Sequence, residues 1–315
     1  MTKDEFRIVF IGALTGGKKC LKALLDAREN VAAVFTWSDG AGKERSCYEP
    51  FDELVAAHGI PLVKVNDINA HDVVEKIRGF KPSVIVVMCW SQMVKKSVIE
   101  IPAHGTIGMH PTLLPKNRGR APIPWAIIKG LDKTGVTIFY INERVDAGDI
   151  LAQEEILIDF EDTAKTLGEK VDMVAEKLLC RAVREIREGK AKPIPQDNSQ
   201  ATYWPKRNPE DGLVNWAQKP IAVYNFIRAL VKPYPGAFTF VSNKKLLLWN
   251  AKSPESHNHR AAAGQILKFD SLGMKVATNG GSVWINSVEL DGDKERNGEE
   301  VKNVPELREG LMLGR

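Results

Sequence analysis

The sequence predicts an α/β protein in which a Rossmann-like domain with a parallel-rich sheet is followed by a small OB-like β-barrel domain. The uninterrupted, largely β-branched run of residues 83–88 is typical of a strand buried on both faces of a parallel sheet. The chain opens with the pattern of a strand (6–11), a glycine-rich turn (12–17) and an amphipathic helix. Beyond residue 203, short strand-like runs alternate with Gly and Asn turns, as in small barrels.

Hydrophobic periodicity predicts the other elements in chain order. We expect strands at 31–36, 60–63, 106–109, 135–141, 150–156, 246–249, 264–267, 274–277 and 283–288. Helical spacing is found at 51–58, 73–77, 122–128 and 161–188, and we also expect a closing helix at 304–313. Residues 38–48 are polar and glycine-containing, which predicts a surface loop.

These elements predict two domains. Residues 1–190 would form a catalytic domain and 204–315 the small β-barrel domain. The intervening stretch, 191–203, contains Lys-Pro-Ile-Pro and polar residues, which predicts a linker. A chain of 315 residues is long enough to bury a core in each domain.

Composition excludes several classes of protein. A hydrophobic content of 43% and a net charge of +4 are those of an ordinary globular protein, without the concentrated basic face of most nucleic-acid binders. The four cysteines are widely spaced, so we expect reduced thiols, and no His/Cys cluster has metal-ligand spacing. No signal peptide or membrane-length apolar run is visible, which predicts a cytoplasmic protein without a membrane partner. The glycines at 12, 16 and 17 lack Gly-x-Gly-x-x-Gly spacing, so we do not expect a dinucleotide site.

The chemistry is concentrated in residues 104–128. A predicted strand delivers His110 directly before a proline, and a loop containing Arg118, Gly119 and Arg120 follows before the helix at 122. Ligands of open α/β sheets bind at the carboxyl ends of strands, which is where His110 would lie. Asp146 follows the next predicted strand and would return to the same sheet edge.

These residues resemble the folate-dependent formyltransferases, whose shared pattern is Asn-x-His, Ser-Leu-Leu-Pro, Arg-Gly, Thr-Gly-Val-Thr and Asp-x-Gly-x-Ile. The corresponding segments here are Gly108-Met109-His110, Thr112-Leu113-Leu114-Pro115, Arg118-Gly119, Thr134-Gly135-Val136-Thr137 and Asp146-Ala147-Gly148-Asp149-Ile150. The resemblance implies an enzyme that moves the formyl group of 10-formyltetrahydrofolate to an amine, with no metal. It assigns His110 as general base and oxyanion donor and Asp146 as its electrostatic partner. It also implies a folate pocket walled by Met88, Trp90, Leu114, Ile141 and Val145, although Trp90 would serve equally well as a core aromatic residue.

One position departs from the pattern, because the asparagine that binds the oxyanion in the family is Gly108. Losing one such donor typically costs about 10²–10³ in rate. Either another group supplies the hydrogen bond (Ser91, Gln92, Thr106, a backbone N–H or water), or the protein is slow or inactive.

The acceptor is predicted from the loop at 118–120. Arg118 and Arg120 flank Gly119, and guanidinium groups commonly bind pyrophosphate or carboxylate, although both could be solvated surface residues. The sequence Arg-Gly-Arg-Ala-Pro-x-x-Trp resembles that of the enzyme that formylates UDP-4-amino-4-deoxy-L-arabinose. We therefore expect a nucleotide-linked amino sugar of a surface glycan as substrate.

Three other functions stay open. Methionyl-tRNA formyltransferases more often carry Arg-Gly-Ala-Ala-Pro and a basic insertion near 38–48, where this chain has only Lys43 and Arg45, so tRNA is the less favoured acceptor. Hydrolysis of 10-formyltetrahydrofolate and non-catalytic ligand binding are the other two. The sequence leaves the oligomeric state open, with a homodimer as one arrangement.

Overall fold

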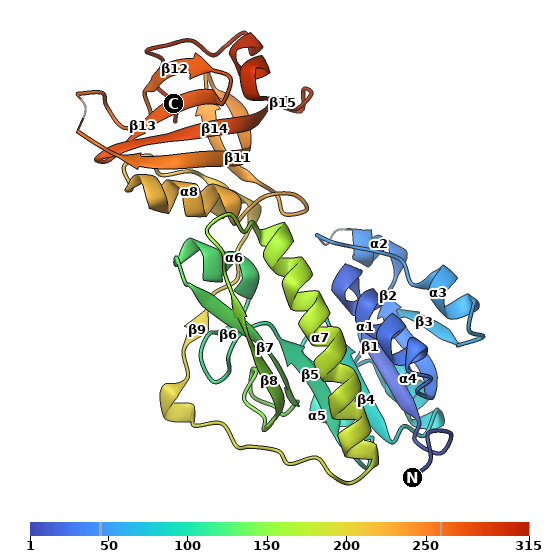
Figure 1. Cartoon of the computed structure of the whole chain (residues 1–315). Coiled ribbons are helices and arrows are strands. Elements are labelled where there is room, and N and C mark those ends of the chain that lie inside the picture. The colour runs from blue at the N-terminus through green and yellow to red at the C-terminus, as the bar shows by residue number, and fades with distance from the viewer. Residues whose placement is uncertain (44–45, 259, 315) are drawn as a thin grey trace. The chain divides into compact units, whose positions relative to one another are not determined.

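The computed structural model describes residues 1–43, 46–258 and 260–314. It divides into two compact units (Figure 1). The first comprises residues 1–122, 133–157 and 169–205, and the second comprises 123–132, 158–168 and 206–315. The chain therefore crosses between the units more often than a single boundary near residue 200 predicts.

The first unit is built on a seven-stranded sheet in the order β3-β2-β1-β4-β5-β7-β8. The five strands from β3 to β5 are parallel, and β7 and β8 extend the sheet in antiparallel fashion. The strands are β1 (Ile8–Gly12), β2 (Val31–Trp37), β3 (Leu62–Val65), β4 (Val84–Met88), β5 (Thr106–His110), β7 (Lys133–Tyr140) and β8 (Ile150–Leu157). β1 and β4 are buried at every residue, as a central parallel strand requires.

Helices cover both faces of this sheet. One face packs against α4 (His71–Gly79) and α5 (Lys96–Ile99), in a core that includes Val9, Phe35 and Ile85. On the other face, α1 (Leu14–Asp26) and the long α7 (Ala164–Arg187) run side by side and are joined by the ion pair between Lys19 and Asp172, 2.8 Å (Figure 1). The apolar residues Leu167, Val171, Leu178 and Val183 of α7 are buried, which confirms the helical spacing predicted for 161–188.

The second unit contains an antiparallel sheet in the order β10-β11-β14-β13-β12, with β15 paired to β14. Its strands are β10 (Ala237–Val241), β11 (Lys244–Ser256), β12 (Ile266–Asp270), β13 (Gly273–Thr278), β14 (Gly281–Leu290) and β15 (Arg296–Asn297). α8 (Pro220–Arg228) packs on β11, and α6 (Pro122–Ile128) lies almost entirely in this unit. The predicted fold class, a mostly parallel α/β sheet followed by an antiparallel β domain, is confirmed.

Three local predictions need correction. Residues 191–203, predicted as a linker, belong to the first unit, where β9 (Tyr203–Trp204) pairs with β6 (Arg118–Gly119). The loop predicted at 38–48 begins with a short helix, α2 (Asp39–Lys43); α3 (Asp52–Ala56) follows it, and Arg45 lies outside the described residues. No helix forms at 304–313. A short 3-10 helix (Gly298–Asn303) ends before this stretch, and Met312 within it forms an antiparallel β-bridge with Gln265.

Candidate active site

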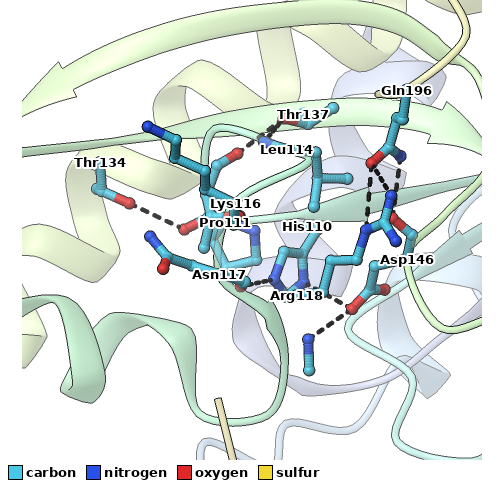
Figure 2. Close-up of polar contacts among 12 residues, drawn as sticks. His110, Pro111, Leu114, Lys116, Asn117, Arg118, Thr134, Thr137, Asp146 and Gln196 are labelled. Carbon is cyan, nitrogen blue, oxygen red and sulfur yellow. Dashed lines mark hydrogen bonds and ion pairs between the residues drawn. The ribbon is translucent and has the colours of Figure 1, made fainter. Parts of the chain in front are cut away.

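His110 is the last residue of β5 and is held from both sides of its ring (Figure 2). Its side chain is buried, with only 5% of the residue exposed. Nε2 lies 2.8 Å from the carbonyl oxygen of Asn117, and Nδ1 lies 3.6 Å from Oδ2 of Asp146. A carbonyl oxygen only accepts hydrogen bonds, so this contact assigns the proton to Nε2 and leaves Nδ1 facing the carboxylate.

Asp146 reaches His110 from the turn between β7 and β8. Its backbone is left-handed, with φ of +50°, and its Oδ2 accepts a 2.8 Å hydrogen bond from the N–H of Gly119. The turn is tight, because a β-carbon at Gly148 would lie 1.7 Å from the carbonyl oxygen of Tyr140. The end of β5 and the turn between β7 and β8 therefore bring together His110 and Asp146, which the sequence predicted to act as a pair.

Gly119 is required by the fold at this point. Its φ is +106°, and a β-carbon there would lie 2.4 Å from the carbonyl oxygen of Trp204. Gly119 was predicted as part of the substrate-binding loop, but its close approach is made to β9, and its N–H donates to the carboxylate of Asp146. This glycine orients the candidate catalytic carboxylate.

Arg118 does not have the exposure that a substrate contact requires. It is 1% exposed, and its guanidinium donates to Gln196 Oε1 (2.6 and 3.2 Å), Asn198 Oδ1 (2.9 Å) and the hydroxyl of Tyr203 (3.0 Å). We therefore correct the prediction that Arg118 binds substrate. Arg120 is exposed, and its guanidinium has no partner in the described ranges 1–43, 46–258 and 260–314, so of the two arginines only Arg120 is available to a ligand.

Sequence reasoning missed Asn117 and Gln196. Asn117 supplies the carbonyl that binds His110, and Gln196 donates to the carbonyl oxygen of Asp146 (2.9 Å) (Figure 2). Gln196 also donates to the carbonyl oxygen of Gly148 (2.6 Å). Gln196 lies 50 positions from Asp146 in a stretch without periodicity. Nothing local in the sequence distinguishes it from a solvated glutamine.

The five predicted folate-pocket residues differ in what they can offer. Met88 and Leu114 are 0% and 3% exposed, so their side chains belong to the core and do not provide pocket surface. Trp90 and Ile141 are half-buried and Val145 is exposed, and these three stay predictions.

Trp90 lies two residues after the end of β4 and stacks on Trp37, the last residue of β2. The ring centroids are 3.9 Å apart and the planes differ by 5°. The Nε1 atom of Trp90 is buried and has no hydrogen-bond partner among the described residues. A buried N–H without an acceptor is costly, but the same burial means that this edge of the ring offers no surface to a ligand.

The space next to Gly108 is filled by Ile141. A β-carbon at Gly108 would lie 2.9 Å from Cδ1 of that side chain. Two of the proposed substitute donors are used elsewhere: Thr106 donates its proton to the carbonyl of Ile99 (2.9 Å), and Gln92 bonds the loop at 67–68 with both ends of its amide. These contacts do not bear on the other candidate donors, which are Ser91, a backbone N–H and water.

Other reactive groups are not arranged as a site. No three His, Cys, Asp or Glu side chains in the described part of the chain are placed to hold a metal ion. All four cysteines are unpaired with one another, and burial raises the pKa of the Cys89 thiol to about 12. No helix within the described ranges is long and apolar enough to cross a membrane.

Comparison with known families gives two matches that together cover most of the chain. Residues 6–183 match the family described as "Formyl transferase", and residues 206–305 match "Formyl transferase, C-terminal domain".

Curated relatives match this chain over nearly its full length. The chain is 32% identical to the methionyl-tRNA formyltransferase of Geotalea uraniireducens over 312 residues, with 98% of each chain covered. It is 33% identical to the corresponding enzymes of Acetivibrio thermocellus and Bacillus velezensis, each over 311 residues with at least 98% of both chains covered.

Solved structures share the fold at lower identity. HypX from Aquifex aeolicus, solved with tetrahydrofolic acid, is 22% identical with a TM-score of 0.67; the match covers 95% of this chain and 47% of HypX, so this chain spans about half of that protein. An N-formyltransferase from Helicobacter canadensis, solved with folinic acid and dTDP-3-aminofucose, is 17% identical with a TM-score of 0.68, over 89% of this chain and 98% of that one.

Proposed function

Because the chain belongs to the formyl transferase family, we propose that it transfers the formyl group of 10-formyltetrahydrofolate to the amino group of methionine carried on tRNA. The observation that carries the choice of acceptor is similarity over the full length. Relatives named methionyl-tRNA formyltransferase are 31–33% identical over 98% of this chain. This acceptor replaces the nucleotide-linked amino sugar as the first candidate.

The pair formed by His110 and Asp146 supports amine formylation. Since Nε2 of His110 is bound to the Asn117 carbonyl, Nδ1 is the ring atom left to exchange protons. In the proposed step the amine nitrogen forms a bond to the formyl carbon, and the bond from that carbon to the donor nitrogen breaks. His110 Nδ1 takes the proton of the amine and returns it to the departing nitrogen. Asp146, 3.6 Å from Nδ1, stabilises the charged imidazole between these two transfers.

The surroundings of Trp90 support a folate donor. A pterin is flat, which suits contact with the half-buried ring of Trp90. Ile141 is half-buried and Val145 is exposed, and both could cover such a ring. We propose these three residues as its contacts. The bound donor supplies the activated formyl group, and the chain supplies its orientation and the proton path.

A nucleotide-linked amino sugar is the second candidate acceptor. It is favoured by Arg120, which is exposed in the Arg-Gly-Arg loop and has no side-chain partner in the part of the chain that the structure describes. A guanidinium in this position suits a pyrophosphate. Arg118 gives no such support, since its donors are used within the chain.

The experiment measures release of tetrahydrofolate from 10-formyltetrahydrofolate with three acceptors in parallel. These are methionyl-tRNA, a panel of UDP- and dTDP-linked amino sugars, and no amine. His110→Ala is the test variant, and His71→Ala, which removes an exposed histidine from α4, is the matched control.

Each outcome assigns a function. Formylmethionyl-tRNA that is lost only in His110→Ala supports the proposal. Formylated sugar without formylated tRNA moves the assignment to the second candidate, and amine-independent release indicates a hydrolase. Binding of the donor without turnover contradicts catalysis altogether.

A further inference from the structure

Residues 194–204 lie along the candidate active site instead of linking two domains. Ile194 and Ile150 exchange both backbone hydrogen bonds at 2.8 Å, so this segment adds to the sheet at the start of β8. Nine residues later, β9 pairs with β6. Gln196 lies between these two attachments and is 9% exposed.

The amide of Gln196 is fully used, and its two ends serve different partners. Nε2 donates to the backbone carbonyls of Asp146 and Gly148, at 2.9 and 2.6 Å. Oε1 accepts from Nε and Nη2 of Arg118, at 3.2 and 2.6 Å. A carboxamide donates at one end and accepts at the other, whereas a carboxylate only accepts, so a glutamate could replace the contact to Arg118 but not the contacts to the two carbonyls.

Arg118 fixes the position of Gln196. The guanidinium also donates to Asn198 and Tyr203, which belong to the same segment, and only 1% of the residue is exposed. A buried guanidinium without these acceptors would carry a large desolvation cost, so the four contacts hold it in one place. Arg118 therefore joins the 194–204 segment to the loop that also carries Gly119.

The turn that carries Asp146 depends on this arrangement. Residues 142–145 are exposed, so the side chains directly before Asp146 contribute little packing to hold it in place. Its carboxylate is oriented by Gly119, and its backbone by Gln196. A displacement of about 1 Å at such a group can reduce catalysis by about 10²-fold.

We infer that Gln196 is a positioning residue for the reaction, which holds the backbone of Asp146 at the distance from His110 that proton transfer requires. The inference rests on the proposed function of the His110–Asp146 pair. Gln196 acts through Asp146 and is assigned no contact with either substrate.

Two substitutions separate positioning from simple anchoring of Arg118. Gln196→Glu keeps the size of the side chain and the acceptor for Arg118, but directs a carboxylate at two carbonyl oxygens. Gln196→Leu removes both functions. Gln200→Leu is the matched control, because Gln200 lies in the same segment, is exposed, and has no side-chain partner in the described ranges.

The first measurement is steady-state formyl transfer. We expect both Gln196 variants to lose about 10²-fold in kcat, with the KM for 10-formyltetrahydrofolate within about twofold of the parent value. Gln200→Leu should match the parent chain. Wild-type kcat in Gln196→Glu would overturn the inference, because Gln196 would then serve only as an acceptor for Arg118.

A second measurement does not depend on turnover. In ¹⁵N-histidine NMR, with His110 assigned through His110→Asn, we expect the Nδ1 resonance to shift in both Gln196 variants and to stay in place in Gln200→Leu. An unchanged resonance in folded Gln196→Glu overturns the inference. If the parent chain transfers no formyl group, the proposed function fails, whereas a shifted Nδ1 resonance would still support positioning by Gln196.

Discussion

The side chain of Ile141 occupies the space into which any side chain at Gly108 would extend. A β-carbon on Gly108 would lie 2.9 Å from Cδ1 and 3.0 Å from Cγ1 of Ile141, closer than unstrained contacts allow. The backbone of Gly108 has no positive φ, so space alone opposes a side chain here. An asparagine at position 108 would therefore require Ile141 to move or to be replaced by a smaller residue.

This relationship predicts different results for single and double substitutions. Gly108→Asn alone should destabilise the chain by about 1–3 kcal/mol through overpacking, without an increase in kcat. Gly108→Asn combined with Ile141→Ala gives the amide room, and we expect kcat to rise roughly 10-fold, toward the 10²–10³ that one oxyanion donor contributes. Steady-state transfer assays measure both, with Ile141→Ala alone as the control. A faster single variant Gly108→Asn would show that Ile141 moves aside freely.

Gly119 should tolerate no side chain. Gly119→Ala places a β-carbon 2.4 Å from the Trp204 carbonyl at a φ of +106°, and we expect a loss of about 1–3 kcal/mol in the free energy of unfolding. Formyl transfer should fall as well, because the N–H of residue 119 orients Asp146. Urea denaturation measures the stability. Gly79→Ala is the control: it lies in α4 with no atom within 4 Å of the added carbon, and it should be neutral or slightly stabilising.

Features that depend on neighbouring residues in the sequence could be predicted. The apolar run at 83–88 became β4, and Pro122 begins a helix, because burial on both faces and a fixed φ leave a local signature. His110 lies at the end of a strand as expected. The position of Asp146 near His110 was also predictable, because the strand between them returns the chain to the same edge of the sheet.

Features that depend on polar partners far away in the sequence could not be predicted. Arg118 and Gln196 are 78 positions apart, and a buried arginine that donates to amide oxygens has the same sequence context as a solvated one. The Pro-containing stretch at 191–203 has the composition of a linker, but it is held by backbone pairing to β6 and β8. Neither hydrophobic period nor motif spacing reports such contacts.

Asp146 should be required for its charge more than for its shape. Asp146→Asn retains an oxygen that can accept from Gly119 but removes the negative charge facing His110. We expect kcat to fall about 10²–10⁴-fold with little change in stability. Asp149→Asn, at an exposed carboxylate of the same turn, is the matched control for the kinetic assay. Comparable activity in Asp146→Asn would mean that Asp146 is a structural residue only.

Cys20 should be protected from alkylation in the folded chain. Burial raises the pKa of its thiol well above the ordinary value, so less thiolate is present at any given pH, and the sulfur is also shielded from the reagent. At pH 8 we expect iodoacetamide to label Cys20 at least roughly 10²-fold more slowly than in the urea-unfolded chain, because labelling requires opening of the core. Because the reaction goes through the opened state, its rate should level off above about pH 8.5, as for an exposed thiol, but at a much lower value. Mass spectrometry of tryptic peptides measures this, with the half-buried Cys180 as an internal reference that should react faster. Equal rates at the two cysteines would mean that the interface between α1 and the sheet opens readily.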